Sequence, residues 1–172
     1  RLCFEQAAAM NASPQLRERA MYNYTVCVHE TSYAGFGESV EILERFLNEF
    51  PTSAYADRVN SYLVETYMHT KNYDAALQSI AKIKHPSAVV LEAKQKLLFK
   101  AGTEAFANGD LKKAVGKFNE SMKVGDYSRQ TIADALFWRG EAYYRGGNYG
   151  QAAKDYSRYL AQTAERQVRT YG

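Results

Sequence analysis

The stretch that decides the fold is residues 140–156, which read GEAYYRGGNYGQAAKDY. A glycine and a tyrosine lie three residues apart before a turn that ends at Asn148, and Ala152 and Tyr156 lie four residues apart after it. Apolar residues three and four apart share one face of a helix, and Gly-Gly-Asn is typical of the end of one helix and the start of the next. The stretch therefore predicts a helical hairpin.

The same pattern recurs along the chain at a spacing of 38 residues, with an earlier and looser copy around Ser39. The turn residues and the alanines four positions after them are in register: Asn72, Asp110, Asn148, Ala76, Ala114 and Ala152. One hairpin buries only one face, so repeated hairpins must stack in a row. The sequence predicts one repeat array over 1–172, with hairpins at 14–50, 54–84, 87–123 and 128–162 and half-repeats at 1–11 and 164–172.

Helix boundaries follow from proline and from Ser or Thr caps, as at Pro14, Pro51 and Pro86. No segment alternates apolar and polar residues as a strand does, so the fold class is all-α. The helices are expected near 1–11, 14–32, 37–49, 54–70, 73–84, 87–107, 110–123, 128–145, 148–162 and from 164 onward.

Small residues have a mechanical role in this pattern. Gly102 and Gly140 in the first helices, together with the alanines of the second helices, let two antiparallel backbones approach closely where they cross. We expect Ile80, Phe118 and Tyr156, four residues after those alanines, to pack against the next hairpin.

The composition excludes several classes of protein and partner. Hydrophobic residues make up 46% of the chain and charged residues 24%, which is typical of a folded globular protein rather than a disordered or collagen-like one. The net charge is only +3 and the basic residues are scattered, so nucleic acid is not an expected partner. No apolar run is long enough to span a membrane.

Histidine and cysteine are also scarce, and they offer no site for chemistry. His29, His69 and His85 lie in different predicted hairpins and form no metal or catalytic motif, so we expect no cofactor and no enzymatic activity. Cys3 and Cys27 lie about equally far from the turn between the first two predicted helices. They are either small packing residues or a disulfide pair.

With these residues in view, the chain resembles the tetratricopeptide repeat family. The residues that carry the resemblance are Gly140, Tyr143, Asn148, Tyr149, Ala152 and Tyr156, Gly102, Asp110, Ala114 and Phe118, and Tyr67, Asn72, Tyr73 and Ala76. The resemblance implies a right-handed α-α superhelix that binds proteins or peptides. The family period is 34 residues, so the longer period here predicts a first helix about one turn longer.

The segment 46–56 also resembles bacterial envelope repeat proteins, namely outer-membrane assembly lipoproteins and the periplasmic coordinator of the Tol-Pal system. This resemblance implies a periplasmic or outer-membrane-associated location. The chain begins at Arg1 and stops at Gly172 in helix-like sequence, so we expect a fragment of a longer protein. Apolar residues near these ends predict weak self-association.

The resemblance places a partner on the concave surface formed by the first helix of each hairpin. Helical spacing selects the residues that project there: Tyr24, Arg58, Glu65, Met68, His69, Lys96, Phe99, Thr103, Phe106, Asp134, Phe137, Glu141, Tyr144 and Arg145. Aromatic and arginine side chains are common anchors in protein recognition. The prediction is a non-catalytic scaffold that binds a protein or peptide.

Two alternatives remain open. The aromatic residues on this stripe could instead pack the longer first helices against their neighbours, which would make the chain a structural spacer. The chain could also be the helical accessory domain of a larger protein whose activity lies elsewhere.

Overall fold

The computed structural model describes residues 13–31 and 36–171, with side chains described for 13–31 and 37–165. The described residues form eight helices and no strand, which confirms the predicted all-α helical-repeat fold. The helices are α2 (Pro14–Glu30), α3 (Phe36–Glu49), α4 (Ala56–His69), α5 (Tyr73–Ala81), α6 (Ala88–Ala107), α7 (Leu111–Lys123), α8 (Arg129–Arg145) and α9 (Tyr149–Tyr171).

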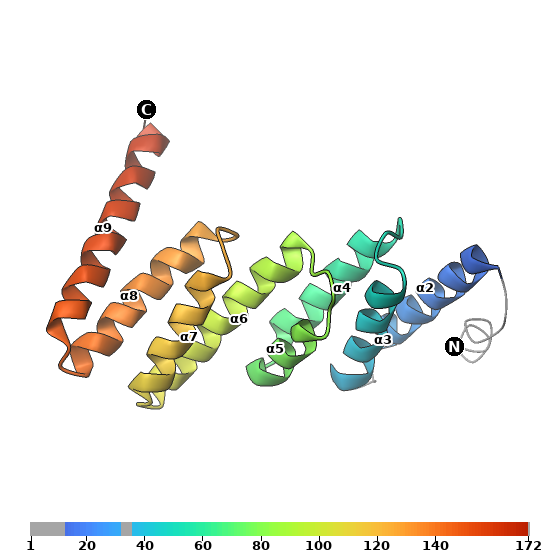
Figure 1. The fold of residues 1–172 in the computed structure, drawn as a ribbon, viewed down its shortest axis with the longest axis horizontal. Coiled ribbons are helices and arrows are strands. Elements are labelled where there is room, and N and C mark those ends of the chain that lie inside the picture. Colours follow the sequence, from blue (N-terminus) through green and yellow to red (C-terminus); the bar gives the residue numbers. More distant parts are fainter. Residues whose placement is uncertain (1–12, 32–35, 172) are drawn as a thin grey trace. The chain divides into compact units, whose positions relative to one another are not determined.

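The chain forms two compact units, which we call unit 1 (residues 1–90) and unit 2 (residues 91–172). In unit 1, α3 contacts α2, α4 and α5. In unit 2, α8 contacts α7 on one side and α9 on the other. Successive helices run in opposite directions within each unit, joined by short connections (Figure 1). None of the helices in the described ranges combines the length and apolar character that crossing a bilayer requires.

The two turns of unit 2 have the same geometry, one repeat apart. In the α6–α7 turn, Gly109 adopts a φ of 80° and the Asp110 N–H donates to the Ala105 carbonyl at 2.9 Å. In the α8–α9 turn, Gly147 adopts a φ of 78° and the Asn148 N–H donates to the Tyr143 carbonyl at 2.8 Å. These bonds are those of a Schellman motif, which explains why glycine precedes the cap in both copies.

The residues that follow these glycines start the next helix. The Asp110 carboxylate accepts from the Lys113 N–H at 3.0 Å, and the Asn148 side chain accepts from the Gln151 N–H at 3.3 Å. In unit 1, Asn72 caps α5 in the same way, accepting from the Ala75 N–H at 3.1 Å. Side-chain oxygens of Asn and Asp satisfy backbone donors that a helix start leaves unpaired, so the turn residues fix the helix starts.

The crossing points within unit 2 require glycine. A Cβ atom built on Gly102 would lie 2.7 Å from the Phe118 ring, and one built on Gly140 would lie 2.8 Å from the Tyr156 ring. Each ring therefore occupies the space next to the glycine of its own hairpin. The sequence had predicted that Phe118 and Tyr156 pack against the next hairpin. Phe118 also belongs to a buried cluster that includes Ala135 of α8.

The C-terminal helix differs from the expectation. A break was predicted between 162 and 164, but α9 is continuous from Tyr149 to Tyr171, so the separate half-repeat over 164–172 is wrong. The sequence from 151 to 171 contains no glycine or proline to end a helix. The Thr163 hydroxyl donates back to the Tyr159 carbonyl at 3.1 Å instead of capping a new helix. The half-repeat expected over 1–11 lies outside the described residues.

A buried polar cluster connects three helices of unit 1. The Ser79 hydroxyl of α5 donates to the Glu44 carboxylate of α3, and the Tyr67 hydroxyl of α4 lies 2.5 Å from the Ser79 Oγ. All three side chains are buried. Burial raises the pKa of Glu44, opposed by the hydrogen bond from Ser79, and burial also raises the pKa of Tyr67.

A second buried polar residue fixes the loop between α7 and α8. Gln95 of α6 is fully buried, and its amide donates to the Ser121 carbonyl at 3.1 Å and to the Gly125 carbonyl at 2.7 Å. Its side-chain oxygen accepts from the Ser128 N–H at 2.8 Å. One side chain thus bonds to three backbone groups at the end of α7 and in the loop that follows it.

Candidate peptide-binding surfaces

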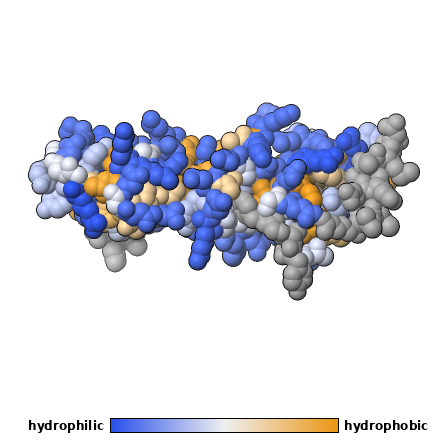
Figure 2. All heavy atoms as spheres, turned by 90° about the horizontal axis from the view of Figure 1, so that it is seen from below, coloured by the Kyte–Doolittle hydropathy of each residue, from blue (hydrophilic) through white to orange (hydrophobic). Residues whose placement is uncertain are grey.

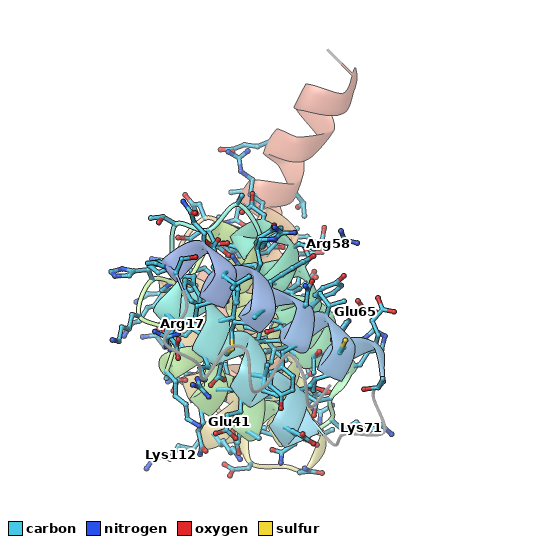
Figure 3. The ribbon with its side chains drawn as sticks, turned by 90° about the vertical axis from the view of Figure 1, so that its right-hand side faces the viewer. Arg17, Glu41, Arg58, Glu65, Lys71 and Lys112 are labelled. Carbon is cyan, nitrogen blue, oxygen red and sulfur yellow. The ribbon has the colours of Figure 1, made fainter. Side chains whose placement is uncertain are left out.

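The residues of the predicted stripe are divided between the two units. The unit 1 surface comprises Tyr24 of α2 and Arg58, Glu65, Met68 and His69 of α4. Arg58, Glu65 and His69 are exposed, whereas Tyr24 and Met68 are half-buried. Figure 3 shows Arg58 and Glu65 projecting on one side of unit 1, away from Glu41 of α3.

Contacts around Tyr62 order the charged residues of the unit 1 surface. The Arg58 Nε donates to the Tyr62 hydroxyl at 3.1 Å, and its guanidinium carbon lies 6.0 Å from the Tyr62 ring centroid. The His29 ring of α2 packs against Tyr62 with centroids 4.2 Å apart, and its Nε2 lies 3.9 Å from the Glu65 carboxylate. A cation, an aromatic ring and an anion of α4 therefore lie in one row, beside the His29 ring of α2.

Helical spacing along the sequence predicted Arg58 and Glu65 as surface residues but did not predict His29 and Tyr62 as members of this row. Tyr62 lies four residues after Arg58 and three before Glu65, so helical spacing was the available signal. His29 could not be found in this way, because its position next to Tyr62 depends on how α2 packs beside α4.

The unit 2 surface comprises the remaining predicted residues, on α6 and α8: Lys96, Phe99, Thr103, Phe106, Asp134, Phe137, Glu141, Tyr144 and Arg145. Their side chains differ in how open they are. Tyr144 and Arg145 are exposed, Phe106 is buried, and the other six are half-buried.

Phe106 packs in the core of unit 2. Its ring lies 5.3 Å from the Trp138 ring, and the Arg145 guanidinium carbon lies 4.3 Å from its centroid. Only 6% of Phe106 is exposed, so the prediction of an open groove residue does not fit its position. Tyr144, the equivalent residue one repeat later, is 57% exposed. The centroid of its ring lies 5.4 Å from that of the Tyr149 ring, which is also exposed.

Two other residues of the unit 2 surface are held by α9. The Tyr156 hydroxyl donates to the Glu141 carboxylate at 2.6 Å. This bond and burial raise the pKa of Tyr156 to about 12, burial being the larger cause. The Phe137 ring packs against the Trp138 and Tyr159 rings, with centroid distances of 5.6 Å and 5.5 Å. Glu141 and Phe137 are thus already in contact with other residues of unit 2, and those contacts would compete with binding of a ligand.

A buried ion pair stabilises the same hairpin. Arg139 of α8 donates to both carboxylate oxygens of Asp155 on α9, with the Nε bond at 2.7 Å, and it also donates to Asn119 of α7. The side chains of Arg139 and Asp155 are 14% and 3% exposed. The hydrogen bonds to Asp155 raise the pKa of Arg139, and the pair fixes α9 against α8.

The described residues offer no cluster of three or more metal-binding side chains. Cys27 is a free, half-buried cysteine, whereas Cys3 lies outside the described residues, so the suggested pairing of the two stays a prediction. On the face shown in Figure 2, hydrophobic residues form small patches between hydrophilic side chains.

Repeated hairpins, Schellman turns and glycine–aromatic crossings define a helical-repeat protein. Comparison with protein families gives a more specific result: residues 99–166 match the tetratricopeptide repeat model, so this segment is similar to that family. The matched segment runs from the second half of α6 into α9. Tetratricopeptide repeats generally mediate protein–protein interactions and are generally not enzymes. A comparison with curated proteins found no match.

Proposed function

We propose that this chain is a non-catalytic scaffold that binds a peptide segment of a partner protein on its first-helix surfaces. The observation that carries the proposal is the ordered row on unit 1, where Arg58, Tyr62 and Glu65 are held by contacts with one another and with His29. Side chains that are already ordered lose less conformational entropy when a ligand binds. Arginine and tyrosine are also frequent anchors of protein recognition.

The chemistry of the row defines the ligand. An exposed guanidinium binds a carboxylate or a backbone carbonyl, and an exposed carboxylate binds a cation or a backbone N–H. Arg58 and Glu65 lie seven residues apart on α4, which is about two helical turns. A peptide with an acidic and a basic residue at a matching separation therefore fits the unit 1 surface.

The test selects peptides from a displayed random library against the chain and measures their affinity for variants. We expect the selected peptides to bind the double variant Arg58→Ala, Glu65→Ala at least about tenfold more weakly, which corresponds to about 1.4 kcal/mol. The matched control is Glu41→Ala, Lys71→Ala, which removes one charge of each sign elsewhere on unit 1 (Figure 3). Equal binding to both double variants, or selection of no peptide at all, would contradict the proposal.

A structural role is the second candidate, and it is favoured for unit 2. Phe106 is buried, and Phe137 and Glu141 contact residues of α9. If unit 2 only positions neighbouring parts of a larger protein, the exchange Phe99→Gln lowers the stability of unit 2 and leaves peptide binding unchanged. If unit 2 binds the peptide, the exchange lowers both.

The resemblance of 46–56 supports a further proposal, that the chain comes from a bacterial envelope protein. In the structure this segment ends α3 and leads into α4, with Phe46 fully buried and the Tyr55 ring stacked on Tyr22 at 4.1 Å. Fractionation of cells that contain the parent protein tests the proposed location. Recovery in the cytoplasmic fraction would contradict it.

A further inference from the structure

Two exposed tyrosines lie at the turn between α8 and α9. Tyr144 is in the last turn of α8 and Tyr149 is the first residue of α9, and they are 57% and 64% exposed. Their ring centroids lie 5.4 Å apart, with the ring planes inclined at 63°. The Schellman turn at Gly147 and the Asn148 cap fix the backbone between the two residues, so the pair of rings is carried by an ordered turn.

A carboxylate lies on the same side of α8 as the first of these rings. Glu141 precedes Tyr144 by three residues, a spacing that makes two side chains neighbours on one face of a helix. The Tyr156 hydroxyl donates to the Glu141 carboxylate at 2.6 Å and so holds one of its oxygens in place. Burial is the largest cause of the raised pKa of Tyr156, and Glu141 and Tyr144 both raise that pKa further, as neighbours do. The aromatic pair therefore has a negative charge beside it.

The preceding repeat shows which group packs on such a ring. Phe106 and Leu111 occupy the equivalent positions to Tyr144 and Tyr149, 38 residues earlier. The Arg145 guanidinium carbon lies 4.3 Å from the Phe106 ring centroid. Figure 1 shows the α6–α7 and α8–α9 turns at the same end of unit 2, which lets α8 supply an arginine to the last ring of α6. Within unit 2 itself, a guanidinium thus covers the aromatic residue at this repeat position.

We propose that Tyr144, Tyr149 and Glu141 form a binding site for an arginine side chain of a partner protein. The face of a tyrosine ring carries partial negative charge and attracts a cation that lies over it. The Glu141 carboxylate adds a full negative charge, and hydrogen bonds between a guanidinium and a carboxylate are among the strong ones. Arg145, the next residue in the chain, packs on Phe106 and so leaves this task to an arginine from outside.

The shape of the site favours arginine over lysine. A guanidinium is planar, so it can stack on a ring while its N–H groups donate to a carboxylate at its edge. A lysine ammonium is compact and more strongly hydrated, and it offers no flat face to stack. This site goes beyond the peptide-binding surface proposed on unit 1, and neither of the two depends on the other.

The experiment titrates a blocked peptide, Gly-Gly-Arg-Gly-Gly, into the isotope-labelled full chain and follows the resonances of residues 141–149 by nuclear magnetic resonance. The matched probe has citrulline in place of arginine, which keeps the planar shape and removes the charge. We expect a saturable shift with the arginine peptide and binding at least about threefold weaker with the citrulline peptide, because a cation on an exposed ring adds a modest attraction. A peptide with lysine in place of arginine should also bind more weakly.

Variants test the residues of the site. Tyr144→Leu and Glu141→Gln should each weaken binding of the arginine peptide at least about threefold, whereas Tyr144→Phe keeps the ring and should bind like the unmodified chain. The matched controls are Tyr127→Leu and Glu120→Gln, which remove an exposed ring and an exposed carboxylate elsewhere in unit 2 and should leave binding unchanged. Circular dichroism establishes that each variant is folded.

The double variant Arg58→Ala, Glu65→Ala separates this site from the unit 1 surface. It should leave the shifts at Tyr144 and Tyr149 unchanged, so a failure at one site is distinguishable from a failure at the other. Absence of any shift at 141–149, equal binding of the arginine and citrulline peptides, stronger binding of the lysine peptide, or an equal loss in the control variants would each overturn the proposal.

Discussion

Gly102 and Gly140 lie directly under aromatic rings, and the space at each is too small for a methyl group. A Cβ on either glycine would approach a ring atom to less than 3 Å. The rings are themselves packed, so Phe118 or Tyr156 would have to shift. We predict that Gly102→Ala and Gly140→Ala lower the free energy of unfolding by about 1–3 kcal/mol, the usual cost of overpacking. Urea denaturation measures the change.

The control for this prediction is Gly116, a glycine within α7 that has no atom within 4 Å of a built Cβ. Alanine is the better helix former, so Gly116→Ala should raise the free energy of unfolding by about 0.5–1 kcal/mol. If all three glycine exchanges stabilised the chain, the close approach of the rings would not be a constraint.

Ser39 is a polar residue at a position where the other repeats have alanine. Its side chain is buried, with 5% exposed, and its hydroxyl has no hydrogen-bond partner in the part of the chain that the structure describes. An unpaired buried hydroxyl costs about 1–3 kcal/mol, so we predict that Ser39→Ala stabilises the chain by about 1 kcal/mol or more. Thermal and urea unfolding check this result.

Ser121 provides the comparison, because it is equally buried but its hydroxyl donates to the Gln95 carbonyl at 2.8 Å. Ser121→Ala leaves that carbonyl without its side-chain donor and should destabilise unit 2. The same sign of change in Ser39→Ala and Ser121→Ala would show that hydrogen bonding does not distinguish the two positions.

At the scale of elements, the Glu44 cluster makes the packing of α3, α4 and α5 depend on pH. Burial raises the pKa of Glu44 above its ordinary value of 4.5, while Lys82 lowers it and Glu41 raises it to smaller extents. The folded state therefore binds the Glu44 proton more tightly than the unfolded chain. This contribution to stability is complete below pH 4.5 and is lost as the pH rises through the folded-state pKa.

The measurement compares the unmodified chain with Glu44→Gln by urea denaturation from pH 4 to 8. We expect the unfolding free energy of the unmodified chain, relative to Glu44→Gln, to fall with rising pH and then to level off. The matched control is Glu104→Gln, which removes a carboxylate at an exposed position of α6. A difference that rises with pH would show that Glu44 is more acidic when folded, contrary to the structure.

Elements were more predictable from the sequence than contacts between them. Helix starts at Tyr73, Leu111 and Tyr149 depend on the residue just before each, which caps the helix through local hydrogen bonds. The surfaces were harder to predict, because Phe106 and Tyr144 are one repeat apart and have opposite exposure. Which of two equivalent residues is buried depends on whether another helix covers it, and local spacing does not contain that information.

At the scale of the whole molecule, each of the two units has buried hydrophobic residues of its own. The core of unit 2 includes Phe118 and Ala142, and that of unit 1 includes Phe46, Leu63 and Tyr67. In repeat proteins, each repeat is stabilised by its own packing and by its nearest neighbours. A destabilising change in one unit is therefore expected to act mainly on that unit.

The single tryptophan, Trp138 in α8, allows this expectation to be tested, because its fluorescence reports on unit 2 alone while circular dichroism reports on all helices. We predict that Gly140→Ala lowers the urea midpoint seen by fluorescence, and that circular dichroism then shows two steps, the later one belonging to unit 1. The exchange Ser39→Ala should instead leave the fluorescence midpoint unchanged. Coincident shifts of both signals in both variants would mean that the units unfold as a single cooperative body.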